Sequence, residues 1–121
     1  MTCDEFRRLA LSRPDAAAKE HMGHPDFRVG GKIFATVGYP DQHTAMVKLT
    51  PMEQEQFVHD QPDVFVPVKG AWGRQGCTQV RLRTAKKPVV RQALRAAWAR
   101  IAPSKASVSV SAKRRSSPGT Y

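Results

Sequence analysis

The residues whose types and spacing point most clearly to chemistry are six cations between positions 81 and 95. They are Arg81, Arg83, Lys86, Lys87, Arg91 and Arg95. The first two lie in a segment that alternates like a strand, and the others lie at or after the start of a predicted helix. Basic side chains and the free amides of a helix N-terminus both bind phosphate. The cluster therefore favours polyanion binding, and the alternative is a solvated basic surface.

Arg91 and Arg95 are four residues apart on the predicted helix. Like charges at this spacing repel each other and weakly destabilise a helix. A local choice that opposes stability is expected at a functional site, and a bound phosphate would relieve the repulsion.

A second candidate is the glycine-rich segment 69–76, which places Trp72 between Lys69 and Arg74. An aromatic ring beside cations can stack on a base or wedge into a groove. A tryptophan in a loop can also fold back over the sheet, which would bury much of its roughly 200 Å² of surface. Of the two interpretations we favour the second.

Metal and catalytic sites are not indicated. His21 and His24, with Asp26 nearby, suggest a metal site, but residues 21 and 24 of one strand point to opposite faces. Cys77 lies near Arg74, which could depress its pKa, yet the first residue of a strand is more often inert packing. We find no nucleophile motif, no paired carboxylates and no phosphate-binding loop. We therefore expect no cofactor and no metal, and we lean against an enzyme.

Charge is unevenly distributed along the chain. All 10 Asp and Glu lie before Val64, whereas 13 of the 20 Lys and Arg lie after it. The formal charge is therefore −3 over residues 1–63 and +13 over residues 64–121. A segregated cationic surface attracts polyanions. This narrows the partner to nucleic acid, an acidic membrane surface or an acidic protein.

Length and cysteine content fit one reduced, globular domain. A chain of 121 residues can bury a single core without disulfides or metal, and two cysteines cannot build a disulfide framework. The N-terminal segment is too charged for a secretory signal, and no apolar run reaches the ~20 residues that span a bilayer. We expect a cytoplasmic monomer without a membrane partner.

Local signals predict three helices. Thr2 and Glu5 have the spacing of a capping box before a helix at 3–12. Thr50-Pro51-x-Glu53 predicts a second helix at about 51–59, with Met52, Phe57 or Val58 packed inward. Pro88 opens a third helix, which ends before Pro103. Its apolar stripe is Val90, Ala93, Leu94, Ala97, Trp98 and Ile101.

Strand patterns fill the remaining segments. Gly30-Gly31 predicts a hairpin turn between 26–29 and 32–37. We favour a three-residue loop, because it places Phe27, Val29, Ile33, Ala35 and Val37 on one face. Strands are also expected at 45–49, at an edge position over 64–68, and at 77–83. Tight turns between neighbouring strands predict an α+β fold, an antiparallel sheet with helices packed on one face as a two-layer sandwich.

The last nineteen residues, 103–121, contain six serines, four cations and no acid. We interpret them as a disordered basic Ser-rich tail. The single domain is then residues 1–102, whose formal charge is +6.

Three segments resemble the MmcQ/YjbR family of small bacterial proteins. They are His24–Thr36 (HPDFRVGGKIFAT), Val47–Pro51 (VKLTP) and Gly70–Gly76 (GAWGRQG). The resemblance covers roughly residues 1–101. It implies a frataxin-like (CyaY-like) fold and a predicted DNA-binding module whose biochemical function is not established. The chain departs from the family at Cys77, where an aromatic residue often follows the last glycine.

Together these observations predict sequence-tolerant binding of nucleic acid, with DNA preferred to RNA and duplex to single strands. The expected contacts are Arg81, Arg83, Lys86, Lys87, Arg91, Arg95, Lys69, Trp72 and Arg74. Two alternatives stay open: an adaptor that uses the same basic surface for an acidic protein, and an enzyme with an unrecognised site.

Overall fold

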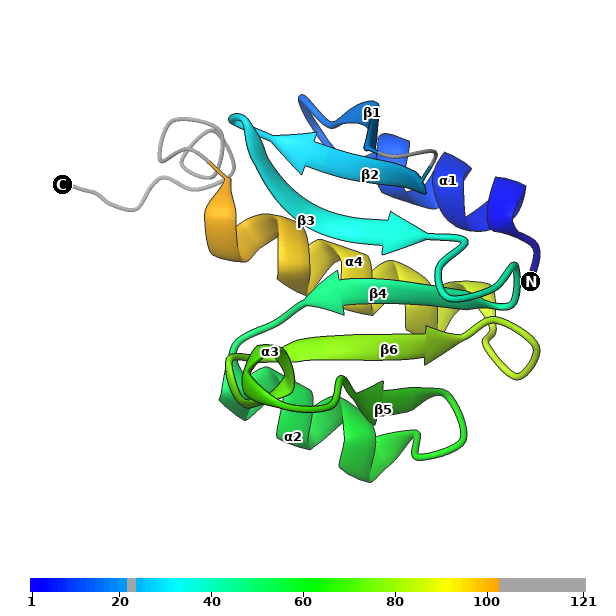
Figure 1. The fold of residues 1–121 in the computed structure, drawn as a ribbon, viewed down its shortest axis with the longest axis vertical. Helices are drawn as coiled ribbons and strands as arrows, with labels where there is room; N and C mark the ends of the chain where they lie inside the picture. The colour runs from blue at the N-terminus through cyan, green and yellow to red at the C-terminus, as the bar shows by residue number, and fades with distance from the viewer. Residues whose placement is uncertain (22–23, 103–121) are drawn as a thin grey trace, which may run out of the picture.

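The sheet at the centre of the molecule has six antiparallel strands in the order β1-β2-β3-β4-β6-β5 (Figure 1). The computed structural model describes residues 1–21 and 24–102. The strands are β1 (Ala17–His21), β2 (His24–Val29), β3 (Lys32–Val37), β4 (Thr44–Lys48), β5 (Phe65–Pro67) and β6 (Cys77–Arg81). The helices are α1 (Cys3–Leu11), α2 (Pro51–Asp60), α3 (Ala71–Arg74) and α4 (Lys87–Ile101). The predicted α+β class with an antiparallel sheet is confirmed.

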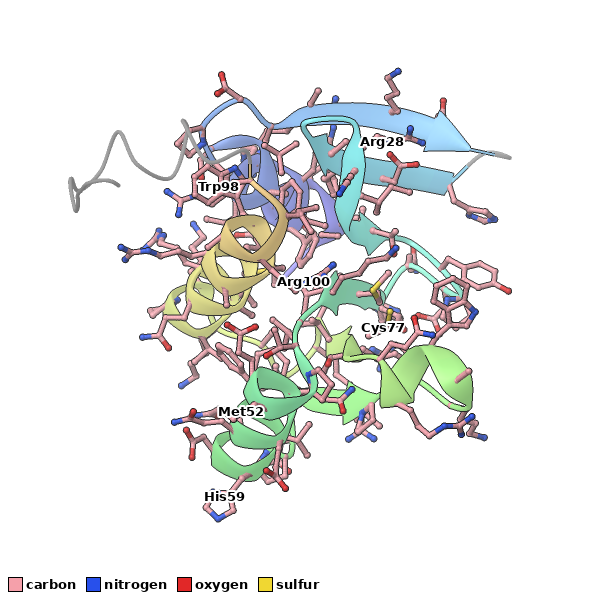
Figure 2. All side chains as sticks on the ribbon, turned by 90° about the vertical axis from the view of Figure 1, so that its left-hand side faces the viewer. Arg28, Met52, His59, Cys77, Trp98 and Arg100 are labelled. Carbon is pink, nitrogen blue, oxygen red and sulfur yellow. The ribbon has the colours of Figure 1, made fainter. Side chains whose placement is uncertain are left out.

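Helices α1, α4 and α2 cover one face of the sheet, and of the described elements only the short α3 lies on the other face, at one end (Figures 1 and 2). We call the second face the open face. Helices α1 and α4 contact each other on the covered face. Trp98 is buried, and its Nε1 donates to the Pro14 carbonyl at 2.8 Å, which ties the end of α1 to α4.

The two predicted capping boxes are both present. The Thr2 hydroxyl accepts from the Glu5 amide at 3.1 Å, and the Glu5 carboxylate accepts from the Thr2 amide at 2.9 Å. Thr50 and Glu53 make the same pair of bonds at the start of α2. These bonds satisfy backbone donors that the first helical turn leaves free. Both helices therefore begin where the sequence predicts.

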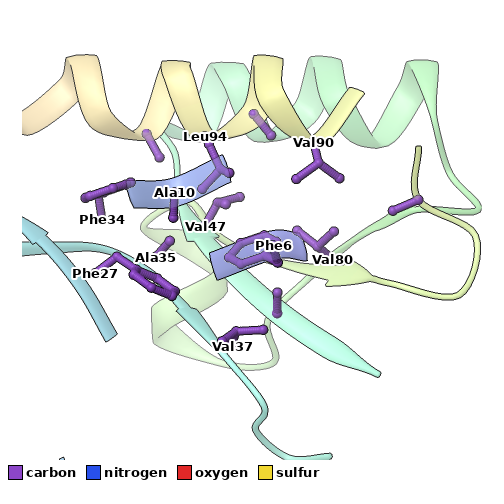
Figure 3. Close-up of a cluster of buried hydrophobic side chains, with 14 of the residues drawn as sticks. Phe6, Ala10, Phe27, Phe34, Ala35, Val37, Val47, Val80, Val90 and Leu94 are labelled. Atoms are coloured by element: carbon purple, nitrogen blue, oxygen red, sulfur yellow. The ribbon is translucent and has the colours of Figure 1, made fainter. Parts of the chain in front are cut away.

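The core lies between the covered face of the sheet and the helices (Figure 3). Phe6 of α1 packs against Phe27 of β2, with ring centroids 6.1 Å apart. Val90 and Leu94 come from the predicted stripe of α4 and are fully buried above the sheet. Burial of these apolar surfaces is the main term that stabilises the fold.

The turn between β2 and β3 has two residues instead of the predicted three. Val29 lies opposite Lys32, so that only Gly30 and Gly31 form the turn. Their φ angles are 60° and 80°. A two-residue hairpin turn of this kind needs a positive φ at both positions, which glycine adopts without strain.

A register shift keeps the apolar side chains on the covered face. Arg28 lies opposite Ile33 but Phe27 lies opposite Ala35, so Phe34 is an extra residue in β3. One extra residue moves the rest of a strand to the other face. The prediction that Ile33 joins the core is therefore wrong: Ile33 lies on the open face, and Phe34 is buried in its place.

Three further details differ from the prediction. Strand β1 was not expected, and its residues Ala17–Glu20 are exposed at the edge of the sheet. A short helix, α3, lies within the segment predicted as a loop. Of the three residues predicted for the inward face of α2, Met52 is 79% exposed, whereas Phe57 and Val58 pack against the core as expected. The predicted tail, 103–121, lies outside the described residues. Within the described part of the chain, no helix is both long and apolar enough to cross a bilayer.

Candidate functional site

The cations of the second half of the chain are at the surface. All nine Lys and Arg between residues 64 and 102 are exposed. Among the described residues only one of the nine joins an ion pair: Lys87 Nζ lies 3.8 Å from Glu5 Oε2. The nine are Lys69, Arg74, Arg81, Arg83, Lys86, Lys87, Arg91, Arg95 and Arg100.

The six cations predicted as one cluster lie on two sides of the molecule. Arg91 and Arg95 are exposed on α4, away from the buried stripe of that helix, on the side that faces outward from the helix layer. Lys86 caps the N-terminus of α4, and Lys87 begins it. Arg81 alternates with the buried Val80 and therefore lies on the open face.

Arg83 is in the connection between β6 and α4, and its Nη2 lies 2.9 Å from His43 Nε2. It donates to the imidazole when that nitrogen is unprotonated. This contact places the β6–α4 connection beside the β3–β4 loop, at the end of β6 away from α3 (Figure 1).

The remaining three predicted contacts lie at the other end of β6: Trp72 and Arg74 belong to α3, and Lys69 precedes it. Trp72 is 60% exposed, so the interpretation in which it folds back and is buried is wrong. It leans over the edge of the open face, where Lys48 Nζ lies 5.6 Å from its ring centroid. A cation at this distance is attracted by the face of the indole.

Two glycines hold α3 close to the sheet. A Cβ at Gly73 would lie 1.6 Å from the Val68 carbonyl oxygen, and one at Gly76 would lie 1.9 Å from the Leu49 carbonyl oxygen. Gly76 also has a φ of 109°. No larger residue fits without a shift of the backbone. The Gly-x-x-Gly spacing is therefore explained by packing.

The open face is hollowed into a groove of about 530 Å³ between α3 and the β3–β4 loop. Tyr39 and Pro40 form one rim and Trp72 the other. The floor comes from β3, β4 and β6 and is mostly apolar: Ile33, Thr36, Met46, Cys77 and Gln79. Tyr39 is 61% exposed, and its ring packs edge-on against His24 at 4.9 Å. A groove of this size and character is typical of a small-ligand site.

A second cavity of about 410 Å³ adjoins the groove and shares Ile33 and Lys48 with it. Its wall is cationic: Arg28, Lys32, Lys48 and Arg100. Figure 2 shows Arg100 at the C-terminal end of α4, and its Nε donates to the Lys48 carbonyl at 3.1 Å. Three of these cations, Arg28, Lys32 and Lys48, come from residues 1–63, the half of the chain whose formal charge is negative.

The Cys77 thiol lies on the floor of the groove but is not activated. Burial raises its pKa, although the positive charges of Lys48 and Arg100 act in the opposite direction. The suggestion of a depressed pKa is therefore wrong. Cys77 is a buried thiol on the open-face side of the sheet (Figure 2).

The prediction that His21 and His24 point to opposite faces of one strand is also wrong. The two residues lie on different strands, β1 and β2, directly opposite each other in the register. Among the described side chains, those of residues 1–20 and 24–102, no three His, Cys, Asp or Glu gather as a metal site requires.

Sequence reasoning missed Tyr39 and Lys48 of the groove, and Arg28, Lys32 and Arg100 of the adjoining cavity. A signal for Lys48 was present, because it alternates with the buried Ala45 and Val47 along β4. Tyr39 follows β3, and nothing in the sequence indicates that it shares a groove with Trp72, which comes 33 residues later.

The model of the YjbR family matches residues 11–100, which include the six strands described above, α2, α3, all of α4 but its last residue, and both rims of the groove. The comparison with curated proteins gave no match.

Proposed function

The chain belongs to the YjbR family, and we propose that it is a small nucleic-acid-binding module that holds DNA by its phosphates. One observation carries the proposal. The nine Lys and Arg of residues 64–102 are all exposed, and among the described residues only Lys87 joins an ion pair. Unpaired surface cations of one sign repel each other, and a polyanion relieves that repulsion.

The contacts that this surface offers to nucleic acid do not depend on the base sequence. Arg91 and Arg95 are exposed, but the apolar stripe of α4 is used in the core, so the helix has only one face for a partner. Lys and Arg that contact phosphates position a protein without reading bases. We therefore expect non-specific dissociation constants of about 10⁻⁴–10⁻⁶ M at physiological salt.

The test is a titration of the full chain with a labelled duplex of about 20 base pairs, its separate single strands and the corresponding RNA. Binding should weaken steeply between about 50 and 200 mM salt, because each phosphate contact releases counterions. Six phosphate contacts on a duplex correspond to a slope of about −5 in log K against log salt.

Absence of binding to all of these probes at about 50 mM salt would contradict the proposal. Polyglutamate serves as the matched polyanion without bases or phosphates. Tight binding of polyglutamate alone would indicate an adaptor for an acidic protein.

A further inference from the structure

Two exposed aromatic side chains face the same groove. In the described part of the chain, the large hydrophobic side chains left exposed are Tyr39, Met52 and Trp72, at 61%, 79% and 60%. Tyr39 and Trp72 are the two rims of the open-face groove, whereas Met52 is on α2. Exposed aromatic surface around a concavity contributes little to folding and is typical of a binding site.

The Trp72 rim is held in place before any ligand arrives. The Gln54 side-chain amide of α2 donates to the Gly73 carbonyl at 2.9 Å and to the Cys77 carbonyl at 3.0 Å. These bonds fix α3 to β6, and Gly73 lets α3 approach the Val68 backbone closely. A rigid aromatic rim loses little conformational entropy when it binds a ligand.

Cations continue from the groove into the adjoining cavity. Lys48 belongs to both, and its ammonium group lies near the Trp72 ring. Arg28 is largely neutralised, because its guanidinium makes two bonds of 2.8 and 3.1 Å to the Asp26 carboxylate. Lys32, Lys48 and Arg100 join none of the ion pairs found among residues 1–21 and 24–102.

We propose that the open face binds single-stranded nucleic acid, with unpaired bases against Trp72 and Tyr39 and the adjoining phosphates on Lys48, Lys32 and Arg100. This inference rests on the proposed function and names the form of nucleic acid. Single strands are bound where aromatic side chains and a positive groove occur together, because each base offers an apolar planar face and each linkage a negative charge.

Other partners fit this combination less well. The bases of a duplex are stacked on one another, so their planar faces are closed to Trp72 and Tyr39. An acidic peptide matches the cations but has no planar group for the rims of the groove. The structure therefore favours a strand with unpaired bases.

The test compares affinities of full-length variants for an oligothymidylate of about 15 nucleotides and for a duplex of the same length. Trp72→Ala and Tyr39→Ala remove the two rims, and Met52→Ala removes an exposed hydrophobic side chain from α2 as the matched control. Base stacking on one aromatic residue corresponds to a loss of roughly 5- to 150-fold in affinity. We expect this loss for Trp72→Ala with oligothymidylate, and less than a twofold change with duplex or for Met52→Ala.

Trp72→Phe keeps an aromatic rim and should restore most of the affinity, which separates stacking from a general disturbance of α3. Equal affinity of the wild type, Trp72→Ala and Tyr39→Ala for oligothymidylate would overturn the inference and leave the proposed function standing. If the wild type binds duplex as tightly as oligothymidylate, the inference is also overturned and the proposed function still stands. Failure of the wild type to bind either nucleic acid at about 50 mM salt would overturn the proposed function and the inference together.

Discussion

The outer side of α4 and the open face of the sheet are both basic, but they differ in what accompanies the charge. Arg91 and Arg95 share α4 with two further exposed cations, Lys87 and Arg100, and none of the exposed aromatic side chains of the described residues belongs to this helix. On the open face, Lys48 lies beside Trp72 and shares a groove with Tyr39. Charge alone attracts any polyanion, whereas charge combined with aromatic rims can select unpaired bases.

The largest effect is expected from reversing the charge on α4. The double variant Arg91→Glu, Arg95→Glu should abolish duplex binding at physiological salt, because it replaces two phosphate contacts by repulsion. Binding of single strands should be weakened but should remain measurable through the open face. Because both side chains are exposed, the free energy of unfolding should change by no more than about 1 kcal/mol.

Anisotropy titrations and thermal melts check this prediction. Duplex binding that survives the double reversal would show that the outer side of α4 is not the phosphate surface. It would contradict the distinction between the outer side of α4 and the open face.

Deletion of residues 103–121 should have the next largest effect. The segment carries Lys105, Lys113, Arg114 and Arg115 and no acid. If all four contact phosphates, their removal flattens the salt slope for duplex by about 3 to 4. The melting temperature should not change, and the preference for single strands should be retained. A loss of that preference would assign it to the tail instead of the groove.

Replacement of one cation on the open face should have a smaller and more selective effect. Lys48→Gln should weaken oligothymidylate binding about tenfold, the cost of one charge-assisted contact, and should flatten its salt slope by about 0.7. Arg8→Gln on α1 removes the same charge from the helix side and should leave oligothymidylate binding nearly unchanged. Equal losses for the two variants would mean that only total charge matters.

The smallest effect concerns acid stability at the end of the molecule where α4 begins. The pKa of Glu5 is lowered first by the Thr2 backbone hydrogen bond and also by Lys87, and the pKa of Asp41 is lowered first by the His43 backbone hydrogen bond and also by Arg83. A lowered pKa in the folded state stabilises the protein above the ordinary pKa, and that contribution is lost as the pH falls through the lowered one.

Thermal melts should therefore show a fall in stability as the pH drops below about 4, where these carboxylates take up protons. Glu5→Gln with Asp41→Asn should show a shallower fall. An equally steep fall in the double variant would assign the acid sensitivity to other carboxylates.

Much of the fold could be predicted because its signals are local. A capping box needs only Thr2 and Glu5, and the α4 stripe is read from its own helix. β1 was missed because its residues are exposed and show no alternation, as an edge strand allows. The shift around Phe34 was missed because a bulge depends on how β3 pairs with β2, not on β3 alone.

The candidate site was less predictable, because it depends on contacts between segments that are far apart in the sequence. Trp72 was recognised as a residue that could stack on a base, but its exposure depends on Gln54 and on the close packing of Gly73. Lys48 was not predicted as a contact, because it belongs to the half of the chain with a negative formal charge. The pairing of β4 with β6 brings that half of the chain to α3 and so creates the groove.

The most direct test of the account follows the two indole N–H signals of the ¹⁵N-labelled full chain during titration with oligothymidylate at about 50 mM salt. Trp72 is exposed at the groove, whereas the Trp98 Nε1 is held by the Pro14 carbonyl in the core. We predict that the Trp72 indole signal, assigned with Trp72→Phe, shifts in a saturable manner while the Trp98 signal stays in place. A Trp72 signal that does not move while oligothymidylate binds would contradict the claim that the open face is the site for unpaired bases.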